Sequence, residues 1–200
     1  MSPRPRQNTD TEILQAAFRA IARLGPVKLT LADVAEEAGV TAASLVQRFG
    51  SKRALLLAAA ADVAGGHVYI FHQLRKRRRS PVAAIVGLAD CMGVMGSTPE
   101  QVAHSLAFLQ IDLNDPSFLA YARASALGMR EGIRALVRDA VAAGELKKCD
   151  TLRLARTLHA TLNGSMLDWA IHREGDMATW LRRDLKMVLE PYRMTVTADA

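Results

Sequence analysis

Few of the residue types that catalyse reactions or bind metals stand in this 200-residue chain at a spacing that would let them act together. Asp168 and His172 are four residues apart, which would place two metal ligands on one face of a helix. No third ligand lies nearby in the sequence, so a polar pair on a helix is the better interpretation. The sequence motifs of nucleophilic hydrolases, zinc proteases, P-loop NTPases and dinucleotide-binding folds are absent. We therefore predict no enzyme, no metal site and no cofactor.

The strongest chemical pattern lies between Thr30 and Lys52. If Leu45 and Phe49 of a helix over 41–49 face a core, Gln47 lies on the opposite side and Arg48 on its flank. Glutamine can bond to adenine through two atoms, and arginine can bond to guanine or to a phosphate. Helix N-termini offer backbone N–H groups to phosphates. The residues predicted to bind DNA are Thr30, Thr41, Ala42, Ala43, Ser44, Val46, Gln47, Arg48 and Lys52.

Three short helices are needed to position these residues. Thr9 with Glu12 and Thr30 with Asp33 have the spacing of capping boxes, and Thr41 can cap the next helix. Gly25-Pro26 and Gly39 are typical helix ends. Short helices separated by about two residues favour a helix-turn-helix unit. The alternative is a three-helix unit that only packs and whose outer face is idle.

The segment resembles the tetracycline-repressor-like (TetR) family of transcriptional regulators over roughly the first quarter of the chain. The resemblance rests on Thr30, Val34-Ala35, Ala38-Gly39-Val40, Leu45, Phe49, Ser51-Lys52 and Leu55. It implies a dimeric repressor whose DNA affinity depends on a small effector. Val46 departs from the family, which usually has an aromatic residue, often tyrosine, that touches the DNA backbone at this position.

The rest of the chain predicts further helices, over 52–75, 81–95, 100–112, 116–143, 151–173 and 177–190. Alanine, leucine and arginine are abundant, aromatic residues make up 5%, and the net charge is +6. We predict an all-α fold of about nine helices. Residues 1–51 would form the helix-turn-helix DNA-binding domain, and residues 52–200 the effector-binding and dimerisation domain.

Polar residues on otherwise apolar helices suggest where an effector would bind. A bundle interior with a few polar groups could hold a small molecule, and Asp112 would favour a cationic or hydroxyl-bearing one, with His104 as its neighbour. The alternatives are that these residues are core and that Asp112 is a solvated turn residue. The predicted ligand-binding residues are Met92, Met95, His104, Phe108, Asp112, Tyr121, Asn163 and Trp169.

The last two long helices predict the assembly. Their apolar residues exceed what two helices at the edge of a bundle could hide, and Gly164-Ser165 would admit a second helix. We expect a two-fold homodimer and a pseudo-palindromic operator in double-stranded DNA. The residues expected to bury this surface are Leu158, Leu162, Met166, Trp169, Trp180, Leu181, Leu185, Val188 and Leu189.

Location and charge complete the expectations. No signal peptide or membrane span is evident, and two isolated cysteines favour reduced thiols, so the chain should be cytoplasmic with no membrane partner. The basic run Arg75–Arg79 is better explained as a solvated helix end than as a second DNA contact, whereas Arg4 and Arg6 could form a DNA-contacting arm. The alternative functions are a ligand-independent DNA-binding regulator and a helical enzyme.

Overall fold

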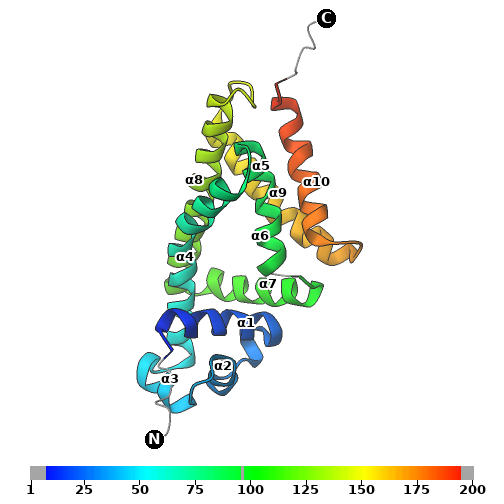
Figure 1. Cartoon of the computed structure of the whole chain (residues 1–200). Helices are drawn as coiled ribbons and strands as arrows, with labels where there is room; N and C mark the ends of the chain where they lie inside the picture. The colour runs from blue at the N-terminus through cyan, green and yellow to red at the C-terminus, as the bar shows by residue number, and fades with distance from the viewer. Residues whose placement is uncertain (1–7, 96, 195–200) are drawn as a thin grey trace, which may run out of the picture. The chain divides into compact units, whose positions relative to one another are not determined.

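The computed structural model describes residues 8–95 and 97–194, and within them the chain is almost entirely α-helical (Figure 1). One antiparallel bridge, between Leu146 and Arg193, is the β-pairing recorded in these ranges. The predicted all-α fold is confirmed. The helices are α1 Asp10–Lys28, α2 Leu31–Ala38, α3 Ala42–Phe49, α4 Lys52–Arg77, α5 Pro81–Val86, α6 Leu88–Met95, α7 Pro99–Asn114, α8 Pro116–Ala142, α9 Thr151–His172 and α10 Met177–Leu189.

Two glycines shape helices in ways that the sequence pattern only partly predicts. Gly25 has φ +73° and kinks α1, so the expected helix end is present, although a short helical turn follows through Lys28. Gly87 separates α5 from α6, where one helix over 81–95 was expected. A Cβ at Gly87 would lie 2.8 Å from Nε of Arg78, so glycine leaves room for this arginine to cross the turn. The described residues therefore form ten α-helices, in agreement with the expected number of about nine.

The chain forms two compact units. The first contains the described residues up to Gly65 together with Ala103–Arg123. Its core joins α1, α2 and α3 to the first half of α4 and to Phe118 of α8. Both capping boxes predicted for α1 and α2 are present. This packing fixes α3 against α2 through buried residues and leaves the other side of α3 in solvent.

The second unit contains Gly66–Val102 and the described residues from Ala124 onward. Its core is larger and includes much of α8, α9 and α10. Close approach of helices is essential here, because a Cβ at Gly132 would lie 2.0 Å from the Phe71 ring. The pairing of Leu146 with Arg193 ties the chain after α10 to the segment after α8.

Helix α4 contributes to both units. By length and composition alone it could cross a membrane. Leu55 and Leu56 are nevertheless buried in the first core, and Phe71 and Leu74 in the second. The apolar character of α4 is accounted for by its position in two protein cores.

Candidate nucleic-acid interface

Helix α2 begins with local hydrogen bonds that satisfy free backbone groups at the helix start. The backbone N–H of Thr30 donates to Asp33 at 2.7 Å, and Asp33 N–H donates to the Thr30 hydroxyl at 3.2 Å. The hydrogen bonds from the Thr30 hydroxyl and backbone hold the pKa of Asp33 below its usual value. Gly39, at φ +66°, ends α2 in the left-handed region that favours glycine. The turn between the two helices thus has a defined direction.

Helix α3 separates its buried side from its exposed side within eight residues. Leu45 is 0% exposed and anchors the helix in the core of the first unit. The Thr41 hydroxyl accepts a hydrogen bond from Ser44 N–H at 3.1 Å, which uses up one of the N-terminal donors. Ala42 and Ser44 are half-buried. We call the exposed residues Ala43, Val46, Gln47 and Arg48 the recognition face.

The recognition face has the shape and polarity that a DNA groove requires. Ala43 and Val46 are small, and Gln47 is exposed with no hydrogen bond recorded for its amide in the described part of the chain. A convex helix surface of small residues can enter the major groove, which is about 12 Å wide, and Gln47 can then reach base edges. Val46, 49% exposed, presents methyl groups and no hydrogen-bonding atom.

Two cations, Arg48 at the margin of this face and Lys52 beyond its end, are held by groups distant in sequence. The Arg48 guanidinium donates to the carbonyl of Asn8 at 2.6 Å and lies 3.5 Å from the Asp10 carboxylate. Lys52 Nζ donates to the carbonyl of Val27 at 3.2 Å. Both side chains are thus held by backbone carbonyls of the first unit. Helical periodicity could not reveal these partners, because they are contributed by other elements.

Further ion pairs stabilise the same unit. The Glu37 carboxylate lies 2.8 Å from Arg19 Nε and 3.8 Å from an Arg23 nitrogen, which joins α2 to α1. Arg53, next to Lys52, lies 2.6 Å from the Asp115 carboxylate and holds the pKa of Asp115 below its usual value. The sequence analysis missed these contacts. The pair of Arg53 and Asp115 fixes the start of α4, where Lys52 is located.

The residues predicted to bind an effector fall into two groups. His104, Phe108, Asp112 and Tyr121 belong to the first compact unit, whereas Met92, Asn163 and Trp169 belong to the second. The Met95 side chain lies outside the described part of the structure. The prediction of one shared cavity stays a prediction.

Within the first unit, Asp112 is the chemically unusual member of this set. Its carboxyl is half-buried, and its Oδ1 has no hydrogen-bond partner among the described residues. Burial raises the pKa of Asp112 to about 6. His104 Nδ1 shares a hydrogen bond with the Ala22 carbonyl at 2.8 Å, and no contact between His104 and Asp112 is recorded among the described residues, so their pairing stays a prediction. Asp112 is thus a half-buried residue of α7 rather than a solvated residue of the turn that follows.

The other predicted ligand residues have structural contacts. Phe108 packs edge to face with Phe118, with ring centroids 6.1 Å apart. Trp169 is 4% exposed, and its indole N–H donates to the Gly175 carbonyl at 3.2 Å. Asn163 is exposed, with its amide nitrogen 3.4 Å from His159 Nε2. Tyr121 and Met92 pack at the edges of the two cores.

The remaining charged candidates are also accounted for. His172 Nε2 lies 3.6 Å from Asp168, and the His172 ring stacks on Trp180. No cluster of three metal-binding side chains occurs within residues 8–95 and 97–194. In the basic run, Arg75 pairs with Asp139 at 3.0 Å and Arg78 pairs with Asp90. Arg4 and Arg6 lie outside the described residues.

Comparison with known proteins places both halves of the chain in one family. Residues 13–59 match the model of bacterial regulatory proteins of the tetR family, and residues 88–190 match the C-terminal part of BetI-type transcriptional repressors. The regulator BetI of Agrobacterium fabrum is 34% identical over 107 residues, or 48% of this chain and 47% of BetI. That alignment spans about half the length of the relative.

Two longer comparisons agree with this assignment. The regulator TtgR of Pseudomonas putida is 26% identical over 199 residues, which cover 91% of this chain and 92% of TtgR. The crystal structure of a TetR transcription regulator from Haloarcula marismortui superposes with a TM-score of 0.73 at 19% identity. The superposition covers 92% of this chain and 98% of the Haloarcula marismortui chain. The structural match shows the shared fold.

Proposed function

Because the chain belongs to the TetR family of bacterial transcriptional regulators, we propose that it is a repressor that inserts the recognition face of α3 into the major groove of its operator. The observation that carries the proposal is the exposed, uncharged strip of Ala43, Val46 and Gln47, with Arg48 and Lys52 fixed beside it. Gln47 would bond to bases, whereas Lys52 and the starts of α2 and α3 would bind phosphates. The chain would act in the cytoplasm and not as an enzyme.

The test separates base recognition from phosphate binding. Gln47→Ala should weaken binding to the operator by about 1–3 kcal/mol and leave binding to random duplex DNA unchanged. Lys52→Ala should weaken binding to all sequences and reduce the salt dependence by about one counterion. Gln110→Ala, at an exposed glutamine of α7, is the control and should change neither. Equal losses on operator and random DNA for Gln47→Ala would refute the assignment of Gln47.

We propose that the repressor is a two-fold dimer that uses an exposed stripe of α9. Leu158, Leu162 and Trp169, which were expected in the dimer contact, are instead buried in the chain's own core, and so are Leu181, Leu185 and Leu189 of α10. That expectation was wrong because these residues occupy the inward helical phase. The outward phase of α9 contains Gly164, Leu167 and Ile171, the last two being 40% and 68% exposed. A Cβ at Gly164 would meet nothing within 4 Å, which leaves room for a second helix.

Sedimentation tests the dimer. Leu167→Asp should convert a dimer into a monomer at micromolar concentration. It should also abolish operator binding, because the single helix-turn-helix unit of a monomer would contact only half of a palindromic site. Leu127→Asp is the matched control, since Leu127 is also exposed but lies on α8. A parent chain that sediments as a monomer and still binds operator would contradict the proposal.

We further propose that an effector releases the repressor from DNA and that Asp112 contacts it. The support is the half-buried carboxyl whose Oδ1 lacks a partner, which a cationic or hydroxyl-bearing molecule could supply. A thermal-shift screen with amines and polyols would identify such a molecule. Asp112→Ala should keep operator affinity and lose release by it. If release is unchanged in Asp112→Ala, Asp112 does not contact the effector. If no compound causes release, a ligand-independent regulator is favoured.

A further inference from the structure

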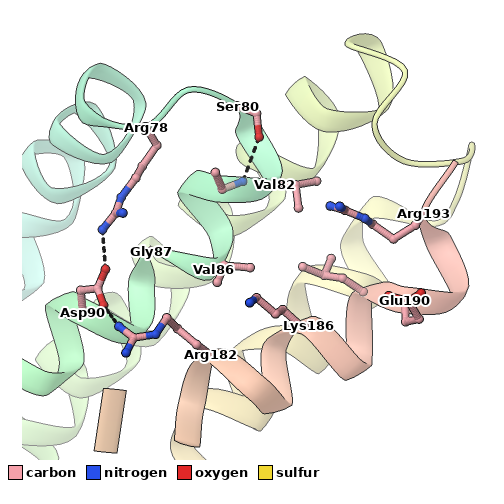
Figure 2. Close-up of a pocket in the computed structure, with 12 residues that line it drawn as sticks. Arg78, Ser80, Val82, Val86, Gly87, Asp90, Arg182, Lys186, Glu190 and Arg193 are labelled. Carbon is pink, nitrogen blue, oxygen red and sulfur yellow. Dashed lines mark hydrogen bonds and ion pairs between the residues drawn. The ribbon is translucent and has the colours of Figure 1, made fainter. Parts of the chain in front are cut away.

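A second concave site lies in the other compact unit, between the α5–α6 segment and α10 (Figure 2). Its volume is about 530 Å³. Four cationic and two acidic side chains line it, which leaves an excess of two positive charges. We call it the cationic pocket, and its charged residues are Arg78, Asp90, Arg182, Lys186, Glu190 and Arg193.

Two arginines in this pocket are fixed by one carboxylate. Asp90 accepts hydrogen bonds from Arg78 through one oxygen and from Arg182 through the other, as the dashed lines in Figure 2 show. Arg182 also donates to the Thr179 hydroxyl at 2.8 Å. Gly87 leaves the space in which the Arg78 side chain lies, as described above. Arg182 also lies 3.6 Å from the Asp176 carboxylate, so two carboxylates face the two guanidinium groups, and the positive charge available to a ligand comes from Lys186 and Arg193.

The opposite wall supplies two cations that have no acidic partner in the described part of the chain. Lys186 is one helical turn beyond Arg182, and Arg193 follows α10. Figure 2 shows both side chains extending from the α10 side toward α5. The pairing with Leu146 fixes the backbone of Arg193. Free cationic groups that converge on a fixed cluster favour an anion with bonds to several donors.

The remaining lining indicates what is attached to the anion. Val82, Val86 and Leu189 border the same cavity. Apolar walls beside converging polar groups are typical of small-molecule sites, and a cavity of this size is large enough for a metabolite. The neighbouring Glu145 carboxylate accepts a hydrogen bond from Val82 N–H at 3.0 Å, so the backbone at the start of α5 is already occupied.

We propose that the cationic pocket binds a small organic anion, with its carboxylate or phosphate between the arginine cluster and Lys186 and Arg193, and its apolar part against α5. This site is separate from Asp112, which by its charge would select the opposite kind of ligand. The proposal does not rest on the proposed repressor function. It assigns a second ligand class to the chain.

Calorimetric titration of the full-length protein tests it. Octanoate and octyl phosphate should bind with a dissociation constant below about 1 mM, and an excess of 1-octanol or octylamine should not displace them. The relative affinities of the two anions, and of inorganic phosphate, would show which head group the pocket prefers. No binding of either octyl anion, or displacement of octanoate by 1-octanol, would overturn the proposal.

Variants locate the binding. Lys186→Gln with Arg193→Gln should weaken octanoate or octyl phosphate binding roughly tenfold, because charge-assisted hydrogen bonds are lost. Arg138→Gln, at an exposed arginine of α8 outside the pocket, should have no effect. Circular dichroism should show unchanged folding. Unchanged anion affinity in the double variant would overturn the proposal, and so would a loss of random-duplex affinity, which would point to DNA instead.

Discussion

The recognition face and the cationic pocket both place polar groups at the surface, but they differ in shape and in how charge is distributed. The recognition face is convex, and its centre, Ala43, Val46 and Gln47, is uncharged. Its two cations stand at the margin and are held by backbone carbonyls of Asn8 and Val27. The cationic pocket is concave, and charged side chains line it on both sides.

This difference corresponds to two kinds of partner. Duplex DNA binds through its phosphates to the cations at the margin of the recognition face. Its bases contact the uncharged centre of that face, which can discriminate among them. A small anion must instead be surrounded, and donors that converge on one point supply most of its binding. The same excess of positive charge in the composition thus serves two separate surfaces.

The largest effect should come from the support beneath the recognition face. Leu45→Ala removes a side chain that is 0% exposed, and we expect it to lower the free energy of unfolding by about 2–4 kcal/mol and to abolish operator binding. Val46→Ala, at the adjacent exposed position, should change the unfolding free energy by less than about 0.5 kcal/mol. Chemical denaturation measures both. Equal destabilisation by the two substitutions would mean that α3 does not separate a buried side from an exposed side.

Asp112 differs in its environment from the charged residues of both surfaces, since its carboxyl is partly buried and its Oδ1 has no hydrogen-bond partner among the described residues. Burial raises its pKa to about 6, whereas an unfolded aspartate has a pKa of about 3.9. Between these values the unfolded state is ionised and the folded state is still protonated, so the stability that this carboxyl contributes is present below about pH 4 and is lost as the pH rises through 6.

We therefore expect Asp112→Asn to stabilise the protein at pH 8 by about 1–2 kcal/mol, after allowance for solvent screening, and to have no such effect at pH 4. Thermal unfolding of parent and variant across this pH range measures the difference. Asp62→Asn, at an exposed aspartate of α4, is the control for the removal of a surface carboxylate. A constant difference at all pH values for Asp112→Asn would show that its ionisation is not responsible.

Sequence patterns predicted which side of α3 is buried and which is exposed, because that geometry is local. Thr30 and Asp33, which form the capping box of α2, are only three residues apart in the sequence. A single helical wheel is enough to place Leu45 and Gln47 on opposite sides of α3. The cationic pocket could not be predicted in this way. It joins Arg78 and Asp90 to Arg182 and Arg193, about a hundred residues further along, and no periodicity relates such segments.

The α9 and α10 helices show an intermediate case. Their apolar residues were recognised, but the assignment of Leu158 and Leu185 to a dimer contact was wrong. An apolar stripe has the same pattern whether it packs inside its own chain or against another one. Which of the two kinds of packing occurs depends on the helices that lie next to each stripe, and these are set by the tertiary structure.

The smallest expected effect compares one helix cap from each region. The Thr30 hydroxyl accepts from Asp33 N–H at the start of α2, and the Ser80 hydroxyl accepts from Ala83 N–H at 3.1 Å at the start of α5. Thr30→Ala and Ser80→Ala each leave one helix N-terminal donor without its side-chain acceptor, so each should lower the free energy of unfolding by about 1 kcal/mol.

The effects of these two substitutions on binding should differ. Thr30→Ala should also weaken DNA binding, because α2 would begin less regularly beside the phosphates, whereas Ser80→Ala should leave DNA binding intact and weaken octanoate binding at the cationic pocket. Denaturation, a gel shift and calorimetry on the same two variants measure all three quantities. If both variants weakened DNA binding equally, the two surfaces would not be independent, and the contrast between a DNA-binding face and a separate anion pocket would fail.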